Sequence, residues 1–265
     1  PRKDTAMQNS PQHPIKNTLL AVSITILVTG CASKNPMPNE YACEGSANYE
    51  VVFKSTWSGD SHPEDIPDKP HFSHLFGLSH NNQVSFWKLG FPVSKGVKNI
   101  AERGSGYKLI KEAEWAIRIN HALDIFDGQE IKHSPGTSIA QFQLTEEFPQ
   151  VTLVNMLAPS PDWITGVASL NLCENGQWVE TKAIPAEVYD AGTDDGRTYT
   201  AEDNPRSEFE PVALLGENDR SDYASFPPVG TYFFTKIDTI SNPDGAGYVK
   251  HVRDNLMKAR QDRLN

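Results

Sequence analysis

Hydrophobic and polar residues alternate along several short segments of the chain, and this pattern is typical of half-buried strands. In residues 48–56, Tyr49, Val51 and Phe53 fall on one side of the segment. Residues 138–145 alternate in the same way. Each segment therefore predicts a strand with one face toward a core and the other toward water.

Two further segments predict strands of a different character. Residues 151–157 are apolar at almost every position, so we expect both faces of that strand to be covered. Residues 230–240 are rich in aromatic and β-branched side chains, which favour strands. Together with the alternating segments, they place strands from the start of the globular part to its end.

Helical periodicity appears in only a few places. Residues 106–128 carry apolar side chains on one broad face, and Gly128 stands where a helix commonly ends. Residues 96–102 predict a shorter helix. The charged tail, residues 241–265, is expected to be a solvated helix or a frayed end, with its helical segment from Tyr248.

Long polar segments rich in proline and glycine separate these elements. They cover residues 58–70, 189–211 and 217–229. Many strands with long loops and one or two inserted helices predict a mainly β protein, an antiparallel β-sandwich with elaborated loops.

The N-terminal part predicts export. Residues 18–30 form an apolar run that is shorter than the roughly 20 residues needed to span a bilayer, but has the length of a signal-peptide core. The end of this run together with the next residue, Leu-Val-Thr-Gly-Cys at positions 27–31, resembles a bacterial lipobox. We expect residues 1–31 to be a signal peptide with Cys31 as lipid acceptor, and residues 32–42 a tether. A buried helix with an incidental cysteine is the alternative.

Ala32 follows the predicted lipid acceptor, where an aspartate would indicate retention in an inner membrane. The expected location is therefore the cell envelope, as an outer-membrane lipoprotein facing the periplasm or the surface.

Composition narrows the classes of partner. The net charge of −10 argues against nucleic-acid binding, which needs clustered Lys and Arg, and against docking on anionic lipid by charge. An acidic balance fits solubility and is compatible with a bound divalent cation.

Two cysteines remain if Cys31 carries lipid. Cys43 and Cys173 form an even pair, which in an oxidising compartment favours a disulfide. Such a bond would close a loop of about 130 residues. Two buried thiols are the alternative.

Four histidines raise the possibility of a zinc site. His62, His71, His74 and His80 lie close in sequence, but prolines make the region irregular, and hydrogen-bonded loop histidines are commoner. No Gly-x-Ser-x-Gly motif marks a serine nucleophile.

Two acidic loops are the other candidate for chemistry. Asp162 follows the strand predicted at residues 151–157, and Asp190 and Asp194 flank the flexible Gly192. Calcium binds carboxylate, carbonyl and water oxygens, which loops at one end of a sandwich could supply. Ordinary Asx turns are the alternative interpretation of this spacing.

Several motifs in one order resemble the spondin domain of F-spondin and mindin. The resemblance covers roughly residues 43–240. In chain order its motifs are residues 49–58 with Trp57, His62 and Pro63, residues 71–77, His80, Trp87, Gly90, residues 94–104, residues 161–163, residues 166–173, Trp178 and residues 189–194.

The resemblance implies a C2-like β-sandwich with helical insertions that binds calcium through loop aspartates. Carried to this chain, the implied Ca²⁺ ligands are Asp162, Asp190 and Asp194, and the implied disulfide joins Cys43 to Cys173. The histidines then belong to a shared structural stretch rather than to a zinc site.

The expected function is that of a lipid-anchored, calcium-binding module for adhesion or recognition. It would bind an unidentified protein or glycan at the cell surface and would not be an enzyme. The first alternative is calcium-dependent membrane binding of the C2 type, which exposed Trp163 and Tyr189 side chains would favour. A metal-dependent enzyme is the second alternative.

Overall fold

The computed structural model describes residues 42–216 and 219–262. The predicted signal peptide, Cys31 and almost all of the tether lie outside these residues. In chain order the elements are β1 Ser46–Ser55, β2 His71–Phe72, β3 Leu75–His80, α1 Lys95–Arg103, α2 Tyr107–Arg118, β4 Ala122–Gly128, β5 Gly136–Thr145, β6 Gln150–Ala158, β7 Trp163–Asn171, β8 Cys173–Glu174, β9 Gln177–Trp178, β10 Thr181–Pro185, β11 Val188–Asp190, β12 Ala213–Leu214, β13 Gly230–Ile237 and α3 Tyr248–Gln261.

One antiparallel sheet has four strands in the order β10-β13-β1-β5. Its central strand β1 pairs with both β13 and β5, so that Val51 lies between Phe234 and Ala140. The alternation predicted for residues 48–56 and 138–145 is confirmed, because every second residue of β1 and β5 is buried. The late strand predicted at residues 230–240 is β13.

The second sheet is larger and runs in the order β12-β11-β7-β6-β3-β4, with β2 attached to β6. The expectation that residues 151–157 are covered on both faces is confirmed. In β6, Leu153 belongs to one hydrophobic cluster, while Val154 belongs to another on the opposite side. This sheet is therefore the middle layer of the fold.

Aromatic side chains fill the space between the two sheets. Phe53 stacks on Tyr232 with ring centroids 4.6 Å apart, and Phe142 stacks on Phe126 from the other sheet at 4.6 Å. Each such side chain contributes roughly 1.5–3 kcal/mol on burial. The Tyr232 hydroxyl donates to Asn155 Oδ1 (2.9 Å), so its polar end is also satisfied. The expected mainly β sandwich is confirmed.

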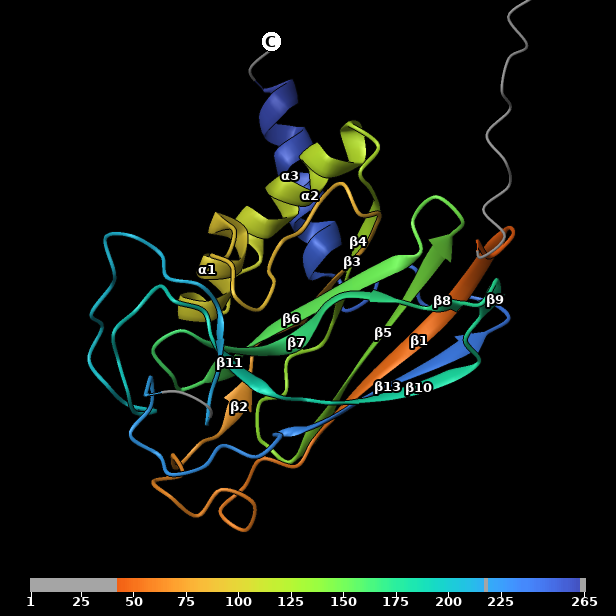
Figure 1. Cartoon of the computed structure of the whole chain (residues 1–265). Coiled ribbons are helices and arrows are strands. Elements are labelled where there is room, and N and C mark those ends of the chain that lie inside the picture. The colour runs from red at the N-terminus through yellow and green to blue at the C-terminus, as the bar shows by residue number, and fades with distance from the viewer. Residues whose placement is uncertain (1–41, 217–218, 263–265) are drawn as a thin grey trace, which may run out of the picture. The chain divides into compact units, whose positions relative to one another are not determined.

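The helices cover the outer face of the larger sheet (Figure 1). Ser94 caps the start of helix α1, where its side chain accepts from Val97 N, and Gly104 in the left-handed conformation (φ 63°) caps its end. Ile100 of α1 and Leu109 of α2 are buried together with Val154 of β6. The described chain thus has three layers, namely sheet, sheet and helices.

The helix predicted over residues 106–128 is wrong in its second half. Helix α2 ends at Arg118, and residues Ala122–Gly128 form strand β4 instead. Asn120 adopts a left-handed conformation (φ 59°), which breaks the helical path. Pairing of β4 with β3 overrides the apolar periodicity, and Gly128 is the last residue of that strand.

The C-terminal tail is a helix, but the prediction of a solvated one is wrong for its first turns. Val249 and Val252 are buried in the cluster beneath the helices. The Asp127 carboxylate at the end of β4 accepts hydrogen bonds from Tyr248 N (3.1 Å) and Val249 N (3.2 Å). A side chain remote in sequence therefore caps the start of α3.

A disulfide joins Cys43 and Cys173, which are separated by 130 residues in sequence. It fastens the chain just before β1 to the short strand β8. None of the helices within the described residues is long and apolar enough to cross a membrane.

Candidate functional site

The register of the larger sheet brings two of the predicted aspartates together. Asp190 ends β11 and pairs with Trp163, the first residue of β7. Asp162 immediately precedes Trp163, so both carboxylates lie at the same end of neighbouring strands. The exposed fractions of Asp162 and Asp190 are 0% and 1%, so both are removed from solvent.

Asp162 organises the loop that follows β11. Its Oδ2 accepts hydrogen bonds from Thr193 N (2.6 Å), Thr193 Oγ1 (3.2 Å) and Asp194 N (3.1 Å). Its Oδ1 is buried and has no hydrogen-bond partner. Since a buried acceptor without a partner is costly, Oδ1 is the atom of this site whose bonding is incomplete.

The electrostatics of the pair follow from burial. Burial, and then the neighbouring Asp190 carboxylate, raises the pKa of Asp162 to about 7. Burial also raises the pKa of Asp190, against the opposing effect of Arg220. Two buried carboxylates that repel each other are stabilised when a proton or a cation compensates their charge.

Asp194 is held differently from the other two aspartates. Its Oδ1 accepts from Gly196 N and its Oδ2 from Asn204 N, both at 2.8 Å. Each oxygen therefore already has a backbone partner, and the carboxylate stabilises the loop in the manner of an Asx turn. The structure thus places Asp162 and Asp190 at the same end of neighbouring strands. Asp194 is joined to Asp162 through its backbone N, but its carboxylate bonds to other backbone groups.

Two arginines that no sequence motif marks lie beside the acidic loops. Arg220 Nη1 lies 2.7 Å from Asp190 Oδ1, and Arg206 Nε donates to the backbone oxygen of Asp194 (3.3 Å). Both arginines also pair with Glu210. They come from a segment rich in charged and turn-forming residues, where no local pattern indicates the partner.

The described residues contain no group of three or more His, Cys, Asp or Glu side chains arranged to hold a metal ion. A cavity of about 310 Å³ opens beside Asp194, and Arg103 and Asp203 also line it. A cation at Asp162 and Asp190 would therefore need backbone or water oxygens to complete its shell.

The aromatic residues next to the two aspartates face inward. Trp163 is fully buried and packs on Tyr199, with ring centroids 5.3 Å apart. Tyr189 is half-buried and packs on Trp87 at 5.2 Å. Trp163 and Tyr189 therefore do not provide the exposed apolar side chains that would favour calcium-dependent insertion into a bilayer.

The four histidines considered for zinc are each bonded to a separate backbone carbonyl. The bonds are His62 Nε2 to Pro227 O (2.9 Å), His71 Nδ1 to Lys69 O (2.8 Å), His74 Nδ1 to Gly128 O (3.0 Å) and His80 Nδ1 to Asn81 O (2.8 Å). His62 and His74 thereby join segments distant in sequence, while the bonds of His71 and His80 are local.

The sequence is similar to that of proteins of the spondin family. The Spondin_N family model matches residues 47–226. Human Spondin-2 is 32% identical over 204 residues, which cover 74% of this chain and 60% of the relative. Spondin-1 of Gallus gallus is 30% identical over 198 residues, covering 71% of this chain and 24% of the relative. The chain therefore spans about 60% or less of the length of these curated relatives, which are named as spondins and not as enzymes. Its match over most of the sandwich shows that this chain belongs to the Spondin_N family.

Proposed function

We propose that this protein is an exported, lipid-anchored recognition module whose spondin domain binds calcium and presents a surface to a protein or glycan at the cell surface. The spondin relatives and the disulfide between Cys43 and Cys173 support export, because disulfides persist in oxidising compartments. The relatives also support a non-enzymatic role.

The observation that carries the calcium proposal is the buried Asp162–Asp190 pair. Asp162 Oδ1 has no hydrogen-bond partner, and among the described residues the salt bridges to this pair comprise one, between Arg220 and Asp190. A hard divalent cation prefers oxygen ligands of this kind. Asp162 and Asp190 would bind the ion directly. The family resemblance implies Asp194 as a third calcium ligand. In this structure its carboxylate would support calcium binding by stabilising the loop.

The role of a bound cation here is structural. It supplies positive charge between two carboxylates that otherwise repel each other. Asp162 already fastens the loop after β11 through Thr193 and Asp194, so charge compensation at Asp162 would fix the conformation of that loop. The rim of this end of the sandwich would then present a fixed surface to a partner.

Thermal unfolding with and without calcium tests the proposal. We expect calcium to raise the Tm of the wild type, since a ligand present at about 100 times its Kd stabilises the folded state by about 2.7 kcal/mol. Asp162→Asn and Asp190→Asn should lose the shift. The matched control is Asp195→Asn, because Asp195 lies in the same loop but is exposed and pairs with Arg206. An Asp162→Asn variant that shifts as much as the wild type contradicts the proposal.

The lipid anchor rests on the sequence around Cys31. Metabolic labelling with a fatty acid analogue should mark the wild-type protein, and Cys31→Ser should abolish the label. Equal labelling of both forms would exclude Cys31 as the lipid acceptor. Capture of surface proteins and glycans from intact envelopes, with and without a chelator, tests the recognition role.

A further inference from the structure

Helix α2 carries a stripe of alternating aromatic and cationic residues on its solvent face. Tyr107, Lys111, Trp115 and Arg118 follow one another at steps of four, four and three residues, which place them on one side of a helix. The exposed fractions of Tyr107 and Trp115 are 41% and 58%. The other tryptophans of the chain, at positions 57, 87, 163 and 178, are buried or half-buried.

The cations of this stripe contact its aromatic rings rather than carboxylates. Lys111 Nζ lies 4.4 Å from the centroid of the Tyr107 ring, and the Arg118 guanidinium lies 5.5 Å from that of Trp115. In the part of the chain that the structure describes, the salt bridges include neither Lys111 nor Arg118. Both positive charges therefore remain available to a partner.

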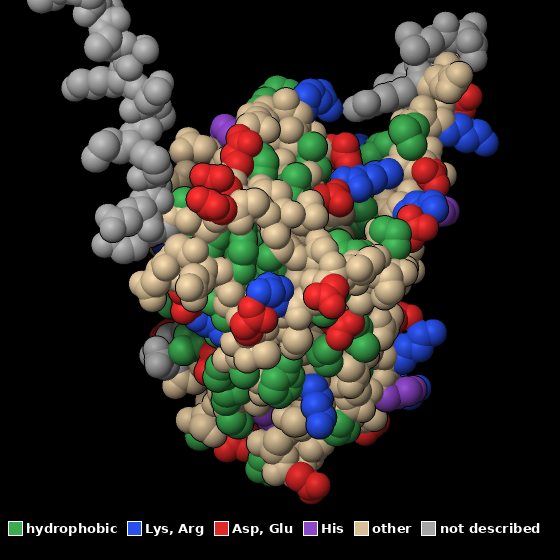
Figure 2. Space-filling view, turned by 90° about the vertical axis from the view of Figure 1, so that its right-hand side faces the viewer, with side chains coloured by type: hydrophobic (Ala, Val, Ile, Leu, Met, Phe, Trp, Pro, Cys, Tyr) green, Lys and Arg blue, Asp and Glu red, His purple; other side chains and the backbone are tan. Residues whose placement is uncertain are grey.

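The two acidic residues of α2, Glu112 and Glu114, form hydrogen bonds with other parts of the protein. Glu112 accepts from Ser94 Oγ (2.6 Å) and Gly96 N (2.8 Å), at the start of α1. Glu114 accepts from Arg253 Nε of α3 (2.6 Å). Glu114 and Asp124 line the same hollow as Lys111 and Arg118, but both carboxylates pair with Arg253. Lys111 and Arg118 therefore supply the unpaired charge of this face, in a chain of net charge −10. Figure 2 shows one face of the molecule, on which acidic and basic side chains are interspersed.

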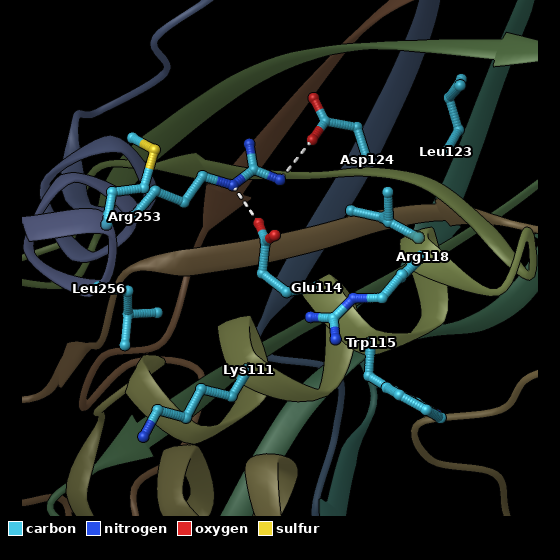
Figure 3. A pocket seen from close by; sticks show the side chains of 10 residues that line it. Lys111, Glu114, Trp115, Arg118, Leu123, Asp124, Arg253 and Leu256 are labelled. Atoms are coloured by element: carbon cyan, nitrogen blue, oxygen red, sulfur yellow. Dashed lines mark hydrogen bonds and ion pairs between the residues drawn. The ribbon is translucent and has the colours of Figure 1, made fainter. Parts of the chain in front are cut away.

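Trp115 stands between two apolar hollows. One, of about 570 Å³, lies between α2 and α3 and includes Leu256 and Met257 (Figure 3). The other, of about 490 Å³, lies on the α1 side and includes Phe86 and Ile119. Met257 is 59% exposed, so apolar surface continues from α2 onto α3. A ridge of aromatic and basic residues is therefore flanked by apolar surface on both sides.

We propose that this stripe docks the domain on a bilayer that contains anionic phospholipid. Tryptophan and tyrosine prefer the headgroup level of a membrane, where lysine and arginine reach phosphates while their stems cover apolar surface. Two cations that no described carboxylate pairs with, in a chain of net charge −10, complement a surface of negative charge such as anionic lipid. The negative charge of the remaining molecule orients α2 toward the membrane.

Flotation with vesicles tests the proposal. The full chain carrying Cys31→Ser, which removes the predicted acylation site, is mixed in EDTA with vesicles of equal parts phosphatidylcholine and phosphatidylglycerol, or of phosphatidylcholine alone. We expect binding to the anionic vesicles to exceed binding to the neutral ones. Replacing Lys111 and Arg118 by Gln should lower the partition coefficient roughly 25-fold, about fivefold for each cation lost. Trp115→Ala should also lower it, because tryptophan favours the membrane interface.

The matched control is Phe91→Ala. Phe91 is 56% exposed and has Lys88 Nζ 5.0 Å from its ring centroid, so it offers a similar pair away from α2. It should leave binding unchanged, and each variant should unfold at the wild-type temperature. Anionic vesicles should also shift the fluorescence that arises from exposed Trp115. Equal binding of the wild type to both vesicle types, or of Trp115→Ala and the wild type to anionic vesicles, overturns the proposal and leaves the surface to a protein partner. Because calcium is absent, neither result depends on the Asp162 site.

Discussion

At the scale of single residues, Asp162 links the charge of the site to stability. Its pKa is raised from 3.8 to about 7, so the folded protein retains a proton that the unfolded chain has released. The stability that protonated Asp162 contributes to the folded state is fully present below the pKa of Asp162 in the unfolded chain. It is lost as the pH rises through the pKa of Asp162 in the folded protein. In chelator, wild-type stability should therefore fall relative to Asp162→Asn as the pH rises toward and past about 7.

Urea unfolding of the two proteins in EDTA, over a series of pH values, measures this difference. It amounts to about 1.4 kcal/mol for each unit by which folding raises the pKa. Parallel stability curves for wild type and Asp162→Asn would show that Asp162 does not titrate in this range. Calcium should remove much of the difference, because a cation replaces the proton.

Gly192 determines the path of the loop between Asp190 and Asp194. It has a φ of 75°, and a Cβ built on it would lie 2.2 Å from the backbone oxygen of Glu210. We expect Gly192→Ala to lower the free energy of unfolding by roughly 1–3 kcal/mol and to weaken calcium binding. Gly45→Ala is the control, since Gly45 has a φ of 71° but no atom within 4 Å of its Cβ position. If both variants lose the same stability, the close contact at Gly192 is unimportant.

The sequence could identify the aspartates but not their surroundings. Asp162 and Asp190 stand in recognisable motifs, and the pairing of β11 with β7 explains why they meet. The pairing of Arg220 with Asp190 joins residues 30 positions apart through irregular loops, where no periodicity specifies contacts. The hydrogen bonding of both Asp194 oxygens is likewise decided by the fold of the loop and not by spacing.

At the scale of elements, the cap that Asp127 provides attaches α3 to the domain. Asp127→Ala removes the acceptor for Tyr248 N and Val249 N, so we expect a loss of about 1–2 kcal/mol in the free energy of unfolding and faster amide exchange in the first turn of α3. Asp127→Asn should retain part of the cap. As a control, Asp124→Ala removes an exposed partner of Arg253, a type of pair that contributes about 0–1 kcal/mol. Unchanged exchange in Asp127→Ala would exclude the capping role.

Element prediction succeeded where one physical signal acted alone. The alternation of apolar and polar residues correctly predicted β1 and β5. The nearly continuous apolar run correctly predicted β6 as a strand covered on both faces. The helix at residues 106–128 failed because Leu123 and Phe126 continue the helical spacing, while the left-handed Asn120 and the pairing with β3 convert that stretch into β4. The buried turns of α3 could not be foreseen, because the surface that covers Val249 and Val252 comes from distant segments.

At the scale of the whole molecule, the disulfide between Cys43 and Cys173 constrains the unfolded chain across 130 residues. Loop-closure entropy for a loop of that length corresponds to about 5 kcal/mol, and measured losses for native disulfides are about 2–5 kcal/mol. Cys43→Ser with Cys173→Ser should therefore lower the free energy of unfolding by that amount, as measured by urea unfolding under non-reducing conditions. Wild type in reductant should match the variant. Equal stability of the oxidised wild type and the variant would contradict this account.

The central claim is that the spondin sandwich holds calcium at the buried Asp162–Asp190 pair, and isothermal titration calorimetry tests it most directly. The full chain carrying Cys31→Ser, freed of divalent ions, is titrated with calcium alongside the same chain with Asp162→Asn, Asp190→Asn or Asp195→Asn. The account predicts one calcium bound by the parent and by the Asp195→Asn protein, and no binding by the other two. Absence of binding to the parent, or equal binding by the Asp162→Asn and Asp190→Asn proteins, would contradict it.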